Sequence, residues 1–174
     1  MTNPYLLSIQ TAVKTMKSLI NILNKTKQHI NTENISEEQI LQSRLAPDMF
    51  PLTKQIQIVS DNAKGMAARL GGLEIPSYKD SESSIDQLIE RLNKTINFVE
   101  SVPKENFNEA ETRQITIQPI PGKYMSAQDY IKGYGLPNFF FHTVTTYAIL
   151  RNQGVSIGKR DYLNMEDINL FDLE

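Results

Sequence analysis

The sequence has 174 residues, 40% of them apolar and 22% charged, and this composition predicts a single domain over residues 1–174 with an ordinary apolar core. Its formal net charge is −2, from 18 basic and 20 acidic residues, so no strong field favours binding to nucleic acid or to an anionic membrane. It has no cysteine, which excludes a disulfide framework, thiolate zinc sites and a cysteine nucleophile.

The first predicted helix runs from about Pro4 to His29. Asn3 and Pro4 are typical of an N-cap and a first-turn proline, because the N–H that proline lacks would be unpaired there anyway. Apolar residues then recur three and four positions apart, namely Leu6, Ile9, Val13, Met16, Ile20 and Leu23. This spacing predicts a long helix with one face towards a shared core.

A short helix and a second long helix are predicted next. Ser36 and Gln39 form a capping-box pattern that opens the short helix, and Pro47 stops it. The second long helix begins within residues 48–51 and ends at residues 71–72, where two glycines stand. Its apolar stripe consists of Leu52, Ile56, Val59, Ala63, Met66 and Leu70.

A third long helix follows a loop over residues 73–82. Ser83 can cap this helix, which ends near Pro103. Its stripe consists of Ile85, Leu88, Ile89, Leu92, Ile96 and Val99. A connection of about 10 residues is compatible with an antiparallel neighbour or with a longer crossover.

The only alternating pattern lies over residues 112–118, after a polar stretch at 106–111. Ile115 and Ile117 fall on one side of this segment, which predicts a strand. Pro121 and Gly122 supply a turn, and residues 123–125 are the predicted partner strand. We therefore expect a small β-hairpin here.

The last long helix spans the most apolar run of the chain. A capping-box pattern at residues 126–129 opens a short helix through Tyr134, and the cluster Gly133, Gly135 and Pro137 predicts a kink or break after it. The long helix then runs from Pro137 to Gly154. The remaining tail is predicted to be mostly irregular, with residues 159–161 anchoring it by ion pairs.

Together these elements predict an all-α protein. Four long amphipathic helices, each with one apolar stripe, close on a shared core as an up-down four-helix bundle. The small β-hairpin is inserted before the last long helix.

Three segments carry a resemblance to a known family. They are Leu45-Ala-Pro-Asp-Met-Phe-Pro-Leu52 with Gln55, then Pro137-Asn-Phe-Phe-Phe-His142 with Tyr147-Ala-Ile-Leu-Arg151, and Gly158-Lys-Arg-Asp161. They resemble an uncharacterised domain-of-unknown-function family within the DinB/YfiT-like metalloenzyme superfamily. The resemblance implies a DinB-like four-helix bundle that is often dimeric. In better-studied relatives three histidines hold a divalent metal, one on the second helix and two four residues apart on the last, and some relatives are thiol-dependent transferases or isomerases.

The sequence departs from this three-histidine pattern. His142 matches one member of the pair on the last helix, but Asn138 and Thr146 stand four residues before and after it. The second long helix has no histidine, and its nearest candidate metal ligand is Asp48. A remnant site for zinc or nickel would therefore use His142 and Asp48 alone, fewer than the three protein ligands that such sites normally have.

His142 and Asp48 are the candidate catalytic residues. His142 could act as a metal ligand or as a general base tuned by Asp48, and the alternative is a buried structural histidine bonded to Asp48 or to a backbone carbonyl. Asp48 is equally typical of a residue that favours the start of a helix. The candidate ligand-binding residues are Gln55, Asn138, Tyr134 and Tyr147. The two amides could instead bond to buried polar groups, and the two tyrosines could instead pack in the core.

Two hypotheses about function follow. In the first, a polar pocket around Asp48 and His142 binds a small molecule, with a degenerate metal site and, if catalytic, a metal- or thiol-dependent transfer reaction. In the second, the protein is a non-catalytic homodimeric bundle in which His142 is structural. Both expect a homodimer without nucleic-acid or membrane partners. With no signal-peptide pattern and no apolar run of about 18 residues, we expect a cytoplasmic location.

Overall fold

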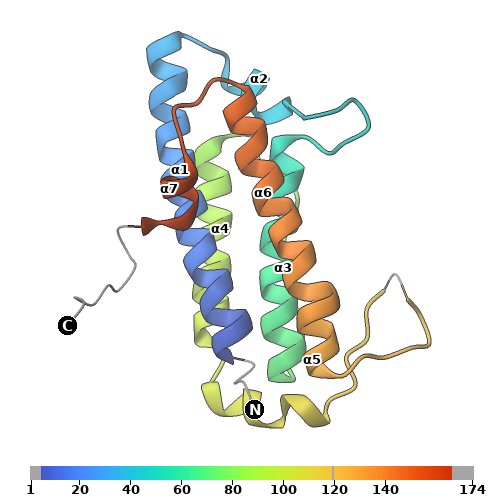
Figure 1. Cartoon of the computed structure of the whole chain (residues 1–174). Coiled ribbons are helices and arrows are strands. Elements are labelled where there is room, and N and C mark those ends of the chain that lie inside the picture. Colours follow the sequence, from blue (N-terminus) through green and yellow to red (C-terminus); the bar gives the residue numbers. More distant parts are fainter. Residues whose placement is uncertain (1–4, 119, 166–174) are drawn as a thin grey trace, which may run out of the picture.

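Four long helices lie side by side and enclose the core in the computed structural model, which describes residues 5–118 and 120–165 (Figure 1). They are α1 (Thr11–Glu33), α3 (Leu52–Gly71), α4 (Ile85–Ser101) and α6 (Leu136–Asn152). Both α1 and α3 pack against α4 and α6. The shorter helical segments are η1 (Tyr5–Gln10), α2 (Glu37–Gln42), η2 (Lys104–Thr112), α5 (Ala127–Tyr130), η3 (Ile131–Gly135) and α7 (Lys159–Leu163).

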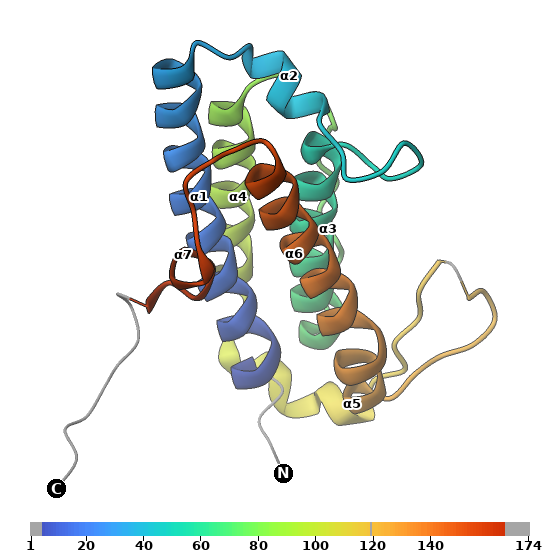
Figure 2. The ribbon, with the colours of Figure 1, turned by 45° about the horizontal axis from the view of Figure 1, so that its top comes forward.

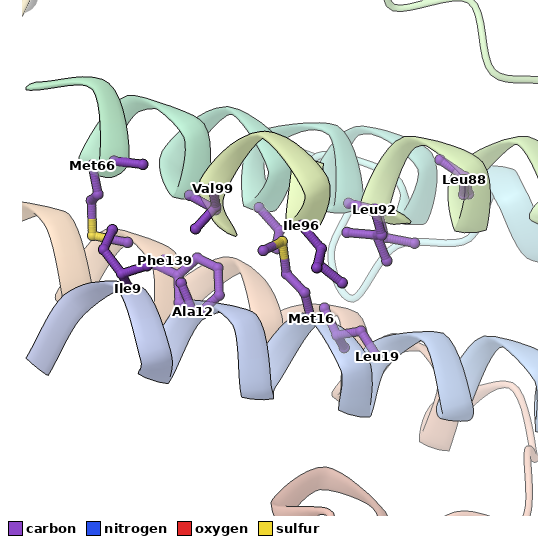
Figure 3. Packing of buried hydrophobic residues seen from close by; sticks show 14 of the residues in the cluster. Ile9, Ala12, Met16, Leu19, Met66, Leu88, Leu92, Ile96, Val99 and Phe139 are labelled. Atoms are coloured by element: carbon purple, nitrogen blue, oxygen red, sulfur yellow. The ribbon is translucent and has the colours of Figure 1, made fainter. Parts of the chain in front are cut away.

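The predicted apolar stripes form the core. In Figure 3, Ala12, Met16 and Leu19 of α1 face Leu92, Ile96 and Val99 of α4, and each of these six side chains is at most 5% exposed. Phe139 of α6 is fully buried, whereas Phe141 is 56% exposed. Successive helical residues point about 100° apart, so the three phenylalanines of α6 cannot all enter the core.

The long helices do not alternate in direction, and the predicted up-down order is wrong at one step. Arg91 of α4 lies 3.0 Å from Asp61 in the middle of α3, and Asn106, just beyond α4, donates to the carbonyl of Gly71 at the end of α3. The helices α3 and α4 therefore run in the same direction. The ion pairs Lys27–Asp86 and Lys17–Glu100 show that α1 and α4 are antiparallel. The hydrogen bonds Gln55–His142 and Asn62–Asn138 show the same for α3 and α6.

The connection over residues 72–84 makes this parallel order possible. A helix of 20 residues such as α3 is about 30 Å long, and an extended chain covers that distance in roughly nine residues. The segment runs back along the helices without helical structure, so α4 starts near α2, where the backbone N–H of Ile85 donates to Glu37. We refer to residues 72–84 as the crossover.

A kink or a break was predicted before the last helix, and no break occurs; a π-helical turn, which is a usual cause of kinks, stands there instead. The chain stays helical from Ala127 to Asn152, because η3 inserts a π-helical turn where the glycines stand. A Cβ atom on Gly135 would lie 2.9 Å from the sulfur of Met66, so a larger residue here would have to displace that side chain of α3. Pro137, which has no N–H to donate, closely follows this π-helical turn.

The predicted β-hairpin is reduced to one antiparallel bridge among the described residues. Ile115 and Met125 exchange both backbone hydrogen bonds, at 3.0 Å and 2.9 Å, and no longer strand forms around them in the described part of the chain. The polar stretch before it is not irregular, since η2 covers Lys104–Thr112. Pro121 has no N–H to donate, which limits further pairing.

The ends of the chain differ in part from the prediction. The predicted start of the first helix at Pro4 lies outside the described residues, and α1 ends at Glu33 rather than at His29. The tail contains α7, and Asp161 pairs with Lys25 of α1 while the Ser18 hydroxyl donates to the carbonyl of Asp161 over 2.6 Å. No helix in the described ranges is both long and apolar enough to cross a bilayer.

Candidate functional site

His142 forms a buried hydrogen bond with Gln55. Its Nδ1 lies 2.7 Å from Oε1 of Gln55 on α3, and its side chain is 8% exposed. The Gln55 amide nitrogen donates to the carbonyl of Phe50 over 3.0 Å, so the amide oxygen must face the imidazole. This arrangement assigns the proton of a neutral His142 to Nδ1 and leaves the lone pair on Nε2. We call these two side chains the Gln55–His142 pair.

The surroundings keep this imidazole neutral. Burial lowers the pKa of His142, because removal from water disfavours the charged form. The ring of Phe141 stands edge-on to it, with the ring centroids 5.1 Å apart. The Gln55–His142 pair therefore offers uncharged hydrogen-bonding groups, with the imidazole in its neutral, proton-accepting form.

Asp48 does not take the place that was predicted for it. It is exposed in the turn between α2 and α3, and among the described residues it makes no hydrogen bond or ion pair with His142. Figure 2 shows that this turn belongs to a loop that extends out from the long helices. The partner of His142 is therefore an amide within α3, not a carboxylate before it.

Asn138 belongs to a second polar contact between α3 and α6. Its amide nitrogen donates to the Asn62 side-chain oxygen over 3.0 Å. The amide nitrogen of Asn62 is buried and has no partner among the described residues. This contact lies one helical turn before His142 on α6, so the α3–α6 interface carries two successive polar contacts.

The two candidate tyrosines lie at different places and do not share a cleft with His142. Tyr134 stacks on Tyr130, with ring centroids 6.1 Å apart. Tyr147 meets Tyr162 of α7 edge-on and helps to line a cavity of about 170 Å³ with Val144. The structure therefore brings together only Gln55 and His142 of the six predicted site residues.

A three-ligand metal centre does not fit these residues. In the described ranges, no group of three or more histidine, cysteine, aspartate or glutamate side chains is arranged to hold a metal ion. One imidazole and one amide oxygen are a poor donor set for zinc or nickel, which take nitrogen, sulfur or carboxylate ligands. No reaction step is assigned through a metal.

The sequence analysis missed a buried arginine that holds the crossover. The side chain of Arg91 is 2% exposed and lies 2.9 Å from Glu82, 3.0 Å from Asp80 and 3.0 Å from Asp61. Burial alone would lower the pKa of Arg91, but the hydrogen bond to Glu82 and the three carboxylates raise it. One feature of the sequence could have indicated it: Arg91 directly precedes Leu92 of the apolar stripe, and the loop before this helix is acidic.

Lys64 of α3 holds the same crossover from the other side. Its ammonium group lies 2.9 Å from Asp61, donates to the carbonyl of Pro76 over 2.8 Å and lies 4.5 Å above the ring of Tyr78. Only 7% of its side chain is exposed. Two buried cations, one on each parallel helix, thus fix the segment that connects those helices.

Comparisons with known proteins agree with this fold. The family described as "Domain of unknown function (DUF1993)" matches residues 5–163. A crystal structure of a DinB family member protein from Shewanella denitrificans is similar to the chain, with 32% sequence identity and a TM-score of 0.90. The match covers 98% of this chain and 95% of that chain. No curated protein matches.

Proposed function

The chain belongs to the DUF1993 family, and from this premise we propose that it is a DinB-like four-helix-bundle protein that binds a small molecule at the Gln55–His142 pair without a three-ligand metal centre. The observation that carries the proposal is the hydrogen bond from His142 to Gln55, together with the bond from Gln55 to Phe50. The two bonds fix one tautomer and orient Nε2 as a hydrogen-bond acceptor.

The chemistry of the pair suggests what kind of molecule it takes. A neutral imidazole nitrogen accepts one hydrogen bond, so the ligand carries a hydroxyl or amide N–H donor. Phe141, edge-on to His142, is 56% exposed and offers an aromatic surface for an apolar group. The partner of His142 in this pair is an amide rather than a carboxylate that would activate the imidazole for catalysis, so the proposed function is binding.

Phenol is a suitable probe because it combines one O–H donor with a ring. Long-range proton–nitrogen NMR of the histidines should show the Nδ1–H tautomer for His142 at pH 7 and a saturable shift of its Nε2 signal on addition of phenol. The variant His142→Gln should lose the binding, and His29→Gln, which removes the other histidine, should retain it. Equal responses of both histidines, or none, would refute the proposed site.

The absence of a metal role is tested separately by calorimetric titration of untagged protein with zinc and nickel. We expect the same weak response from the wild type and from His142→Gln, since one imidazole is too few ligands. Stoichiometric zinc or nickel binding that His142→Gln abolishes would contradict this part of the proposal.

The second candidate function is a non-catalytic homodimer, and one feature of α6 favours it. Phe141 is 56% exposed and Val144 is 48% exposed, and residues three apart share one face of a helix. A helix that is apolar on its outer face as well as its inner face is typical of one that is covered on both sides. In this alternative His142 only stabilises the α3–α6 interface.

Sedimentation velocity tests the dimer. A dimer should have twice the 19.8 kDa mass of the chain, and the double variant Phe141→Ser and Val144→Ser should sediment as a monomer. Tyr124→Ser is the matched control, because Tyr124 is 62% exposed but lies outside α6. A monomeric wild type, or a double variant that remains dimeric, would exclude this face as the interface.

A further inference from the structure

A cavity of about 840 Å³ lies beside the C-terminal half of α3 and contains neither residue of the Gln55–His142 pair. Its walls come from α3, from residues 72–77 of the crossover and from residues 113–118. Figure 1 shows the last of these segments as part of the yellow-to-tan loop next to the lower ends of α3 and α6. The continuous stretch of residues 64–77 therefore meets residues 113–118, which are distant from it in sequence, around one cavity.

The charge of this cavity has one sign. Among the described residues that line it, three are basic, Lys64, Arg69 and Arg113, and none is acidic. Lys64 is paired with Asp61, 2.9 Å away, a carboxylate that it shares with Arg91. The remaining positive charge comes from the two arginines.

Arg69 is held in place by neutral oxygens. Its Nε donates to the carbonyl of Thr116 over 3.1 Å, and its Nη1 lies 3.4 Å from the hydroxyl of Tyr130. A Cβ atom on Gly65 would lie 2.5 Å from that Nη1, so the guanidinium rests where a side chain at residue 65 would otherwise be. These contacts orient the Arg69 guanidinium, and none of them is with a carboxylate that would neutralise its charge.

Arg113 has a similar setting at the end of α3. Its Nη1 donates to the carbonyls of Leu70 and Asn106, at 2.8 Å and 2.7 Å. Its carboxylate neighbour is Glu109, at 3.4 Å with a side chain that is 78% exposed, so solvent screens this pair. Gly72, with φ of +68°, leaves room for the guanidinium, which a Cβ atom there would meet at 2.7 Å.

Apolar side chains form the rest of the wall. Ala68 and Ile115 are buried, whereas Leu73 is 42% exposed and Ile75 is 37% exposed. The volume lies within the range of about 300–1,000 Å³ that is usual for small-molecule sites. The cavity thus combines two oriented guanidinium groups with an open apolar surface.

We infer that this cavity binds an amphiphilic organic anion, whose carboxylate or phosphate head pairs with Arg69 and Arg113 and whose apolar body packs against Leu73 and Ile75. Guanidinium groups suit such heads because their planar N–H forks match the geometry of paired oxygens. Since the two arginines are already oriented, little side-chain freedom is lost on binding. The inference goes beyond the proposed function and does not depend on it.

Octanoate is the test ligand, compared with octanol, which lacks the charge, and inorganic phosphate, which lacks the apolar body. Methyl NMR of the isoleucine and leucine side chains should show saturable shifts at Leu73, Ile75 and Ile115 with octanoate. Loss of a charge-assisted hydrogen bond typically lowers affinity about tenfold or more, so we expect that loss for Arg69→Gln and for octanol. Phosphate keeps the charge but buries no apolar surface, so it should also bind about tenfold more weakly or worse.

Two further variants keep the test decisive. Gly65→Ala retains every charge but displaces the Arg69 guanidinium, and it should also weaken octanoate binding. Lys14→Gln removes an exposed charge on α1 and should leave binding unchanged. Wild-type affinity for octanoate in Arg69→Gln and Gly65→Ala would overturn the inference, as would equal binding of octanol. Phosphate binding as strongly as octanoate would overturn the assignment of the apolar body.

Discussion

Arg91 on α4 lies 3.0 Å from Asp61 on α3 and 2.9 Å from Glu82 in the crossover between these helices. One guanidinium therefore joins both parallel helices and the segment that connects them. This contact holds the crossover in place, since the crossover contributes no buried apolar side chain of its own.

Removal of the buried guanidinium should destabilise the protein. Arg91→Met leaves three carboxylates close together, and breaking a buried ion pair typically costs about 3–5 kcal/mol. Because the side chains of Asp61 and Asp80 are 44% and 37% exposed, we expect about 2–3 kcal/mol in the free energy of unfolding by urea. Lys17→Met, at the exposed pair with Glu100, should cost under about 1 kcal/mol. Equal losses would contradict a special role for Arg91.

The same cluster predicts sensitivity to acid. Although burial alone would raise the pKa of Glu82, hydrogen bonds from Arg91 and Gln57 lower it below its ordinary value of 4.5. A carboxyl group with a lowered pKa stabilises the fold above its unfolded pKa, and this contribution is lost as the pH falls through the folded pKa. The free energy of unfolding should therefore fall as the pH drops below about 4.5, and less steeply in Glu82→Gln than in the control Glu111→Gln.

His142 predicts a second dependence at higher pH. Burial lowers its pKa below the ordinary value of 6.5, so below pH 6.5 the unfolded chain takes up a proton that the folded chain does not. Stability should therefore decline from pH 6.5 down to the folded pKa. His142→Gln should remove this decline, whereas His29→Gln should retain it. Chemical denaturation at half-unit pH steps measures both, and a decline that persists in His142→Gln would assign it to another group.

The hydrogen bond between Gln55 and His142 should appear as an interaction energy. Each alanine substitution leaves a buried polar group without its partner, at a cost of about 1–3 kcal/mol. Because both variants break the same bond, the double variant should cost less than the sum of the two, by about 0.5–3 kcal/mol. A double-mutant cycle from urea unfolding checks this. Strict additivity would show that the two side chains contribute independently.

The sequence predicts the helices well and their directions less well. Apolar spacing depends only on the geometry of one helix, so Met16, Leu92 and Ile96 were assigned to the core correctly. The direction of α4 depends on contacts of Arg91 with residues far from it in the chain. A connection of this length allows both orders, so its composition alone does not decide between them.

The candidate site shows a similar limit. From the sequence, His142 could be a metal ligand, a general base or a buried structural histidine, and its partner depends on how α6 is rotated against α3. Asp48 was expected because a carboxylate readily partners an imidazole, whereas the packing of the two helices selects Gln55. The cavity lined by Arg69 and Arg113 escapes prediction because residues 64–77 and 113–118, which are distant in sequence, form it together.

The crossover also sets a minimum length for this part of the chain. Most surface loops tolerate deletions, since their length changes the free energy of folding only slightly. Here a deletion that left four or five residues between α3 and α4 could not span the roughly 30 Å back to the start of α4. Such a chain could pair the two helices only with α4 turned end for end, which would separate Arg91 from Asp61. In this protein the parallel order of α3 and α4 therefore requires a minimum number of residues in a connection without helical structure.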